Sequence, residues 1–192
     1  MKVFSFPVNT DKFNSVKERH TKKKIFIYYK RRNLKDLQYI TNFLTKKGLE
    51  YRVFDYITRY SEEDNLNYLL GSQYGIILDA HESQGFALEE AMSCNVPLLV
   101  WNTKSMAQEE GSHYDDIPCT TIPYWDKRCG EYFYEREDFK KKFHEFTNKL
   151  ETYQPRQFVL ENLSVESSAT QLLSLIKSIK VKNMEEKSKY VG

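Results

Sequence analysis

The sequence predicts an α/β fold in which a parallel sheet is covered by helices on both faces. Short apolar runs of strand length alternate along the chain with longer segments whose apolar residues recur at helical spacing. The run 25–29 is apolar throughout and follows three lysines, as expected of a strand that is buried on both faces. Strands that alternate with amphipathic helices form parallel sheets with helices on either side.

The strands are expected where apolar runs are bounded by polar or turn-forming residues. We expect them at residues 25–29, 51–56, 74–80 and 96–101, with a fifth near the sheet edge at 119–122. Ligands of parallel sheets bind at the carboxyl ends of the strands. The segments to inspect for a site therefore follow the first four strands, at residues 30–33, 57–60, 81–86 and 102–108.

Capping residues indicate where the helices begin, because their side chains accept hydrogen bonds from the free amides of a first turn. The expected caps are Asn33, Ser61, Ser83, Asp138 and Ser164. Gly48 and Gly71 can end the first two helices, since glycine adopts the left-handed conformation found there. The helix that follows Ser83 is expected over residues 83–94.

One domain with two flanking segments is the expected organisation, since 192 residues suit one domain with a sizeable core. Residues 1–21 are polar and resemble an extended, linker-like arm rather than a core element. Residues 22–180 form the expected domain, and residues 181–192 a charged tail with a frayed end.

Composition is typical of a soluble globular protein, with 40% hydrophobic and 29% charged residues. The formal net charge is only +2, so overall electrostatics indicate no nucleic-acid partner. Basic residues nevertheless far outnumber acidic ones in the first 33 residues. This excess is either a solvated arm or a surface that attracts an anionic ligand or a membrane.

The three cysteines are far apart and odd in number, which favours reduced thiols in a cytoplasmic protein. They form no C-x-x-C pair, so a zinc site is not expected. No apolar run reaches the roughly 18 residues of a membrane span, and the first residues lack the apolar core of a signal peptide.

Residues 80–97, AHESQGFALEEAMSCNVP, carry the strongest local signal. They read as a strand end, a turn of small residues and a helix N-terminus, where free amides and the helix dipole attract anions. Gly85 lets a ligand approach the backbone. Glu82 and Glu90 are separated by about 12 Å along a helix axis. Carboxylates at that spacing can accept hydrogen bonds from a sugar and from a ribose on either side of a diphosphate.

This segment resembles the E-x7-E motif of glycosyltransferases with the GT-B fold, especially the large retaining family called family 4. The motif reads E-S-x-G-hydrophobic-x-x-x-E-A-M-x-C-x-V-P, and residues 82–97 match it nearly throughout. Residues 6–13 are similar to the interdomain linker of that family, and residues 122–130 to the region after its last core strands. The resemblance covers roughly residues 6–179 and implies the Rossmann-like, C-terminal half of a GT-B fold.

The resemblance implies a role for each residue of the motif. Glu82 contacts the donor sugar and is the expected catalytic residue, while Glu90 binds the ribose hydroxyls. The amides near Gly85 and Phe86 face the sugar and phosphate. The expected donor-binding set is Lys30, Arg32, Ser83, Gln84, Gly85, Phe86 and Glu90. Glu89, which directly precedes Glu90, is expected to be its solvated neighbour.

A basic pair after the first strand usually holds the diphosphate in that family. The candidates are Lys30, Arg31, Arg32 and Lys35, of which we favour Lys30 and Arg32, although the spacing departs from the common form. The usual glycine-rich stretch after the fourth strand is replaced by residues 102–106, so donor contacts of that loop are not carried over. No D-x-D motif is present, and neither a metal nor another cofactor is expected.

A GT-B enzyme also needs an acceptor-binding domain, and this chain begins at what resembles the linker. We therefore expect a half that binds a nucleotide sugar for retaining hexosyl transfer, inactive without an acceptor-binding domain or partner subunit. Two alternatives remain. One is a non-catalytic module that binds a nucleotide or nucleotide sugar, and the other is an unrelated flavodoxin-like protein.

Overall fold

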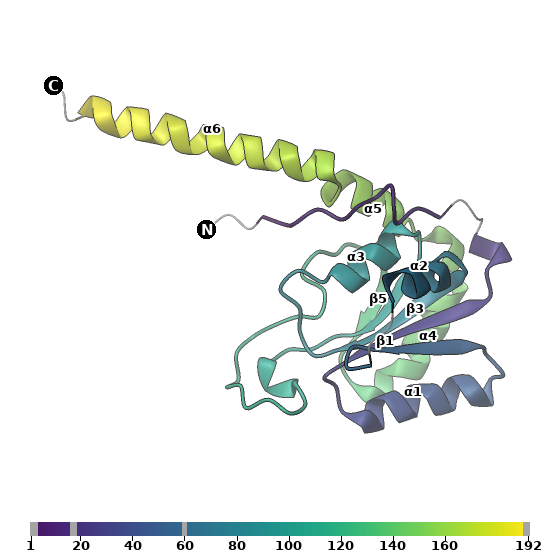
Figure 1. The fold of residues 1–192 in the computed structure, drawn as a ribbon. Coiled ribbons are helices and arrows are strands. Elements are labelled where there is room, and N and C mark those ends of the chain that lie inside the picture. The colour runs from purple at the N-terminus through teal and green to yellow at the C-terminus, as the bar shows by residue number, and fades with distance from the viewer. Residues whose placement is uncertain (1–3, 16–18, 59–60, 190–192) are drawn as a thin grey trace.

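A computed structural model of the chain describes residues 4–15, 19–58 and 61–189. Five parallel strands form one sheet in the order β2-β1-β3-β4-β5. Their bounds are β1 (Lys24–Lys30), β2 (Tyr51–Asp55), β3 (Ser72–Asp79), β4 (Leu98–Trp101) and β5 (Gly130–Phe133). Figure 1 shows the sheet between its helices. The α/β fold with a helix-covered parallel sheet is therefore confirmed.

In the described residues, six α-helices and four short 3-10 helices connect and cover the strands. The α-helices are α1 (Leu34–Lys46), α2 (Glu62–Leu70), α3 (Phe86–Ser93), α4 (Phe139–Asn148), α5 (Pro155–Asn162) and α6 (Val165–Lys189). The 3-10 helices are η1 (Arg19–Thr21), η2 (Met106–Gln108), η3 (Arg136–Asp138) and η4 (Leu150–Thr152). Asn33, Ser61 and Ser164 cap α1, α2 and α6 as expected. Asp138 instead ends η3, and its side chain makes no capping hydrogen bond to α4.

The two faces of the sheet bury different side chains, because neighbouring strand residues point to opposite sides. Ile27 of β1 joins Ile40 of α1 and Phe139 of α4 in one buried cluster. Phe26, its neighbour in the strand, joins Leu69 of α2 in the other cluster, to which α3 and α5 also contribute. Helices α1 and α4 thus cover one face, and α2, α3 and α5 cover the opposite face.

The N-terminal arm is more than an extended lead-in. Val8 and Phe13 are each only 3% exposed and belong to the core cluster beneath α3 and α5. The Val8 amide donates to the carbonyl of Leu163, and the Phe13 carbonyl accepts from Ser93 and Arg156. Sequence analysis missed this because two apolar residues in a polar stretch show no periodicity.

The strand expected at 119–122 is the main error in the fold prediction. The edge position belongs to β5, where Gly130 pairs with Leu98 of β4. Residues 119–122 instead cross the carboxyl edge of the sheet. There the Asn102 side chain accepts hydrogen bonds from Thr120 and Thr121, and the Thr120 carbonyl accepts from the Glu82 amide. Side-chain hydrogen bonds and isolated backbone hydrogen bonds, rather than a strand ladder, therefore hold this segment.

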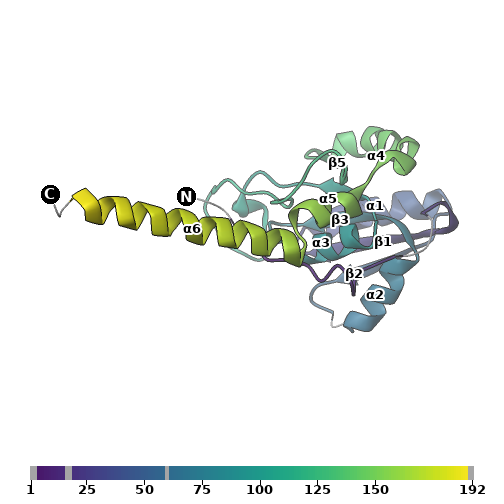
Figure 2. The same cartoon turned by 90° about the horizontal axis from the view of Figure 1, so that it is seen from above.

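Helices α5 and α6 also differ from expectation. Helix α5 was not predicted, and α6 continues to Lys189, through residues assigned to a frayed tail. In both views α6 projects away from the domain beside the N-terminal arm (Figures 1 and 2). Leu173, Ile176 and Ile179 are exposed along it. Within the described part of the chain, no helix combines the length and the apolarity needed to cross a membrane.

Candidate functional site

The carboxyl ends of β1 and β3 bring one lysine between two acidic side chains. Lys30 lies opposite Asp79 in the strand register. The Lys30 ammonium is 2.6 Å from Glu82 Oε1 and 3.8 Å from Asp79 Oδ2. Its nitrogen also lies 5.1 Å from the centre of the exposed Tyr56 ring. The expected proximity of Lys30 and Glu82 at this edge is therefore present.

Burial and charge set the protonation of this cluster. Burial lowers the pKa of Lys30, but the neighbouring carboxyls of Asp79 and Glu82 outweigh it and raise that pKa overall, so the ammonium stays charged. The Asp79 side chain is fully buried, and burial together with Glu82 raises the pKa of Asp79 well above its ordinary range. Asp79 therefore keeps a proton at neutral pH. Sequence analysis did not single it out, because an aspartate that ends an apolar strand resembles a turn residue.

Arg32 does not stand beside Lys30 at an open surface. It is only 4% exposed, its guanidinium lies 5.4 Å from the centre of the Trp101 ring, and it is 3.6 Å from the Asp36 carboxylate. It also donates weakly to the carbonyl of Asp79. The guanidinium thus ties together the ends of β3, β4 and α1, which leaves Lys30, with 19% of its side chain exposed, as the more accessible cation of the favoured pair.

The N-cap of helix α3 lies two residues later than expected. Gly85 is its N-cap, in the left-handed conformation with φ of +83°, and Ser83 is exposed and does not cap the helix. A glycine takes this conformation without the steric cost that a side chain meets. The turn at Gly85 aims the first amides of α3, from Phe86 onward, at the carboxyl edge. The ideal Cβ position at Gly85 lies 3.8 Å from the Cβ atom of Glu82 and from Pro123, so Glu82 and the helix N-terminus are neighbours.

Gln84 holds the N-terminal arm rather than facing the cluster. Its amide oxygen accepts from the Phe6 amide at 3.1 Å, and its amide nitrogen donates to the Phe6 carbonyl at 3.1 Å. The same nitrogen donates to Glu89 at 2.7 Å. Phe86, in contrast, leaves 48% of its surface exposed at the start of α3.

Of the two neighbouring glutamates of α3, Glu89 does not have the environment expected for it. Glu89, expected to be solvated, is 1% exposed, and burial raises its pKa to about 7. Glu90 is half-buried, and burial followed by the charge of Glu62 raises its pKa to about 7, opposed by Lys12. The charges that act on Glu90 thus come from Glu62 in the first turn of α2 and from Lys12 of the arm. The error about Glu89 arose because the turn after Gly85 sets the rotation of the helix, which sequence spacing does not reveal.

A second polar cluster joins the β1–α1 turn to the loop after β4. The Arg31 guanidinium is 2.5 Å from Glu109 Oε1, and the Arg31 carbonyl accepts from the Glu110 amide. His81 Nδ1 lies 3.1 Å from Glu109 Oε2. This cluster was missed because Arg31 and Glu109 are 78 residues apart and match no motif. His81, expected to be a structural turn residue, contacts this loop.

A search of the described residues finds no group of three or more histidine, cysteine or acidic side chains placed to hold a metal ion. All three cysteines are free thiols, and Cys94 and Cys129 are buried.

Comparison with solved structures finds the same fold in a known enzyme. The sucrose-phosphate synthase of Thermosynechococcus elongatus aligns with a TM-score of 0.56 at 13% sequence identity. The match covers 94% of this chain and 53% of the synthase chain, so this chain spans about half the length of that enzyme. No family model and no curated protein sequence matches the chain. The chain therefore shares the fold of about half of that enzyme.

Proposed function

We propose that the chain is the donor-binding half of a retaining glycosyltransferase and that it binds a nucleoside-diphosphate sugar at the carboxyl edge of its sheet. The observation that carries the proposal is the Lys30–Glu82 pair beside the N-terminus of α3. An ammonium, a hydroxyl-binding carboxylate and free helix amides are the groups that a diphosphate with an attached sugar requires. The fold shared with the synthase adds independent support.

Lys30 has the central role in this proposal. Without ligand, its charge is balanced by Glu82 at 2.6 Å. A diphosphate that reaches Lys30 competes for that ammonium and releases the Glu82 carboxylate to accept hydrogen bonds from the sugar. During transfer, Lys30 and the amides at Phe86 stabilise the negative charge that develops on the departing nucleoside diphosphate.

The other parts of the donor are assigned by position along α3. Gly85 lets the phosphates approach the backbone, and Glu90 binds the ribose hydroxyls farther along the helix. No metal ion is required, because Lys30 and the helix N-terminus supply the positive charge. The acceptor comes from a second domain or partner subunit that covers this edge of the sheet, and the working environment is the cytoplasm.

Calorimetric titration with nucleoside diphosphates and their sugars tests this assignment. Lys30→Gln is expected to weaken binding by about 1.5–3 kcal/mol, the usual value of a hydrogen bond to a charged group. Lys46→Ala is the matched control, because Lys46 is an exposed lysine in the last turn of α1, at the opposite edge of the sheet. Equal affinities of Lys30→Gln and the parent, with both proteins folded by circular dichroism, would exclude the proposed site.

A further inference from the structure

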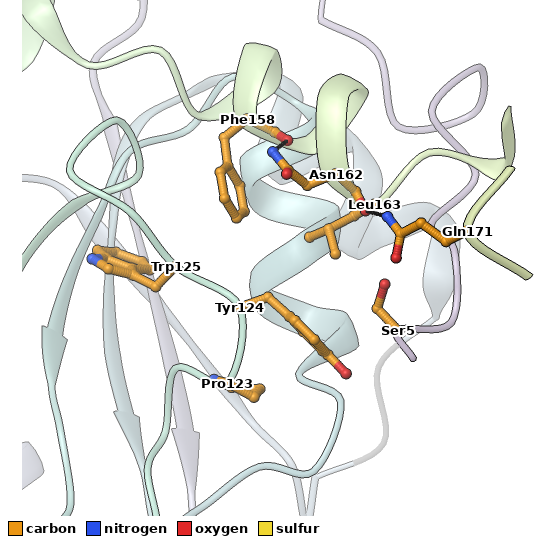
Figure 3. Close-up of a pocket in the computed structure, with 8 residues that line it drawn as sticks. All are labelled: Ser5, Pro123, Tyr124, Trp125, Phe158, Asn162, Leu163 and Gln171. Carbon is orange, nitrogen blue, oxygen red and sulfur yellow. Dashed lines mark hydrogen bonds between the residues drawn. The ribbon is translucent and has the colours of Figure 1, made fainter. Parts of the chain in front are cut away.

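A cavity lies between the N-terminal arm, the segment before β5 and the last two helices. It has a volume of about 300 Å³ and is lined by four separate parts of the chain. Ser5 comes from the arm, Tyr124 and Trp125 from the segment before β5, Phe158 from α5 and Gln171 from α6. Figure 3 shows these side chains around one space. Its size is at the lower end of small-molecule sites.

The chemistry of its walls is aromatic and uncharged. Among the described residues, those that line the cavity carry no charge. Tyr124, Trp125 and Phe158 supply aromatic rings, with Pro123 and Leu163 between them (Figure 3). A ligand with phosphate or carboxylate groups would lose its hydration here without gaining a cation.

Polar groups are nevertheless present along one side. The Gln171 amide nitrogen donates to the Asn162 carbonyl and to Ser167, which fixes the amide plane. Figure 3 shows the Ser5 hydroxyl directed toward the Gln171 side chain. Burial, followed by the charge of Glu89, raises the pKa of Tyr124, so its hydroxyl stays protonated and can donate. The cavity thus combines aromatic walls with hydroxyl and amide groups.

We propose that this cavity binds an uncharged sugar ring. A pyranose presents apolar C–H faces, which suit the rings of Tyr124 and Trp125, and a rim of hydroxyls, which suits Ser5, Asn162 and Gln171. A purely apolar ligand would make no use of the hydroxyl and amide groups, and a sugar phosphate would lack a cation. This site is distinct from the donor site, although Pro123 touches both, since it lies 3.8 Å from the ideal Cβ position of Gly85.

The two tryptophans allow a direct test by nuclear magnetic resonance. Trp125 lines the cavity, whereas Trp101 is buried in the cluster on the opposite face of the sheet. Titration of labelled protein with neutral mono- and disaccharides is expected to shift the Trp125 indole signal in a saturable manner and to leave the Trp101 signal in place. Trp125→Phe identifies the two signals.

Three variants sharpen this test. Gln171→Leu keeps the side-chain size but removes the amide, and it is expected to weaken sugar binding at least about tenfold, the loss of one good hydrogen bond. Gln157→Leu, an exposed glutamine of α5 outside the cavity, is expected to bind as the parent does. Lys30→Gln is also expected to leave neutral-sugar binding unchanged, whatever it does to nucleotide binding.

Several outcomes would overturn the proposal. The first is a Trp125 signal that stays unchanged up to the solubility limit of the sugars. The second is a larger shift of that signal with sugar phosphates or with apolar aromatic compounds. The third is loss of the sugar response in Lys30→Gln. The last outcome would place the sugar in the donor site and leave the cavity without a ligand.

Discussion

Two sides of the molecule that approach each other near Gly85 differ in their electrostatics. On the side of β1 and β3, the charged Lys30 lies between the acidic side chains of Asp79 and Glu82. On the side of α5 and α6, the walls of the cavity are uncharged. The charged side is built from central strands, and the uncharged side from the arm and late helices. The difference indicates that a charged ligand and a neutral ligand can bind to separate surfaces near the turn at Gly85. A substitution can therefore affect one of these surfaces alone.

The largest effect is expected from a substitution in β5, the strand that supports the uncharged side. In Gly130→Ala, the added Cβ would lie 2.0 Å from the carbonyl oxygen of Leu98, on a backbone with φ of +140°. The pairing of β5 with β4 cannot absorb such a contact. We expect a loss of about 4 kcal/mol or more in the free energy of unfolding, measured in urea. Hydrogen exchange should accelerate in β5 more than in β1 and β3.

Gly111→Ala is the control for that experiment. Gly111 also has positive φ, at +79°, but no atom lies within 4 Å of its Cβ position. Its cost is therefore only the backbone penalty, about 1–2 kcal/mol. Similar losses in both variants would mean that the close approach of β4 to Gly130 is not what makes the glycine necessary.

A smaller effect concerns the buried carboxyl between the two sides. The pKa of Glu89 is raised from 4.5 to about 7 by burial. The folded protein therefore binds more protons than the unfolded chain between those values, and this residue lowers stability as pH rises through them. Glu89→Gln removes that contribution. At pH 8 the variant is expected to be more stable than the parent by about 1–3 kcal/mol, and near pH 4 the two should be similar.

Urea unfolding at several pH values checks this prediction. Glu63→Gln, an exposed acid in the first turn of α2, is the control and should leave the pH dependence of stability unchanged. The idea fails if Glu89→Gln is less stable than the parent at pH 8, since the carboxylate would then be favourable where it lies.

The smallest effect concerns the arm. Gln84→Ala removes two hydrogen bonds to the Phe6 backbone and one to Glu89. We expect a loss of about 0.5–1.5 kcal/mol in stability, because the exposed backbone groups of Phe6 can bond to water instead. Amide exchange at Phe6 should accelerate while that of Val8, bonded to Leu163, should not. Gln38→Ala, an exposed glutamine of α1, is the control, and faster exchange at Phe6 in that variant would dissociate the effect from Gln84.

Much of the first half of the fold follows from local signals in the sequence. Apolar runs and capping residues located β1 to β4, and Asn33 and Ser61 cap the helices that they were expected to cap. The structure after β4 could not be predicted from such local signals. The segment 119–122 is apolar enough for a strand, but its partner is the Asn102 side chain. Long-range polar contacts of this kind leave no periodic trace.

The candidate site likewise has parts that the sequence predicts and parts that it does not. The motif, and the position of both residues directly after strands, predicted that Lys30 and Glu82 would lie at the same edge of the sheet, and they are in contact there. The burial of Arg32 depends on Trp101, which lies 69 residues away. The rotation of α3, which buries Glu89 instead of exposing it, depends on the φ of Gly85. Neither is visible in residue spacing.

The length of α6 means that a small rotation at one end displaces the other end by a large distance. Its 25 residues extend about 37 Å, and its main attachment is at α5, at one end. A rotation of only ten degrees at that attachment would carry the far end through roughly 6 Å for a helix of this length. Because Gln171 lies near the attachment, the same rotation would move a wall of the small cavity by far less. A domain or partner attached to the far end of α6 would therefore move much farther than the wall of the cavity, as the end of a long lever arm does.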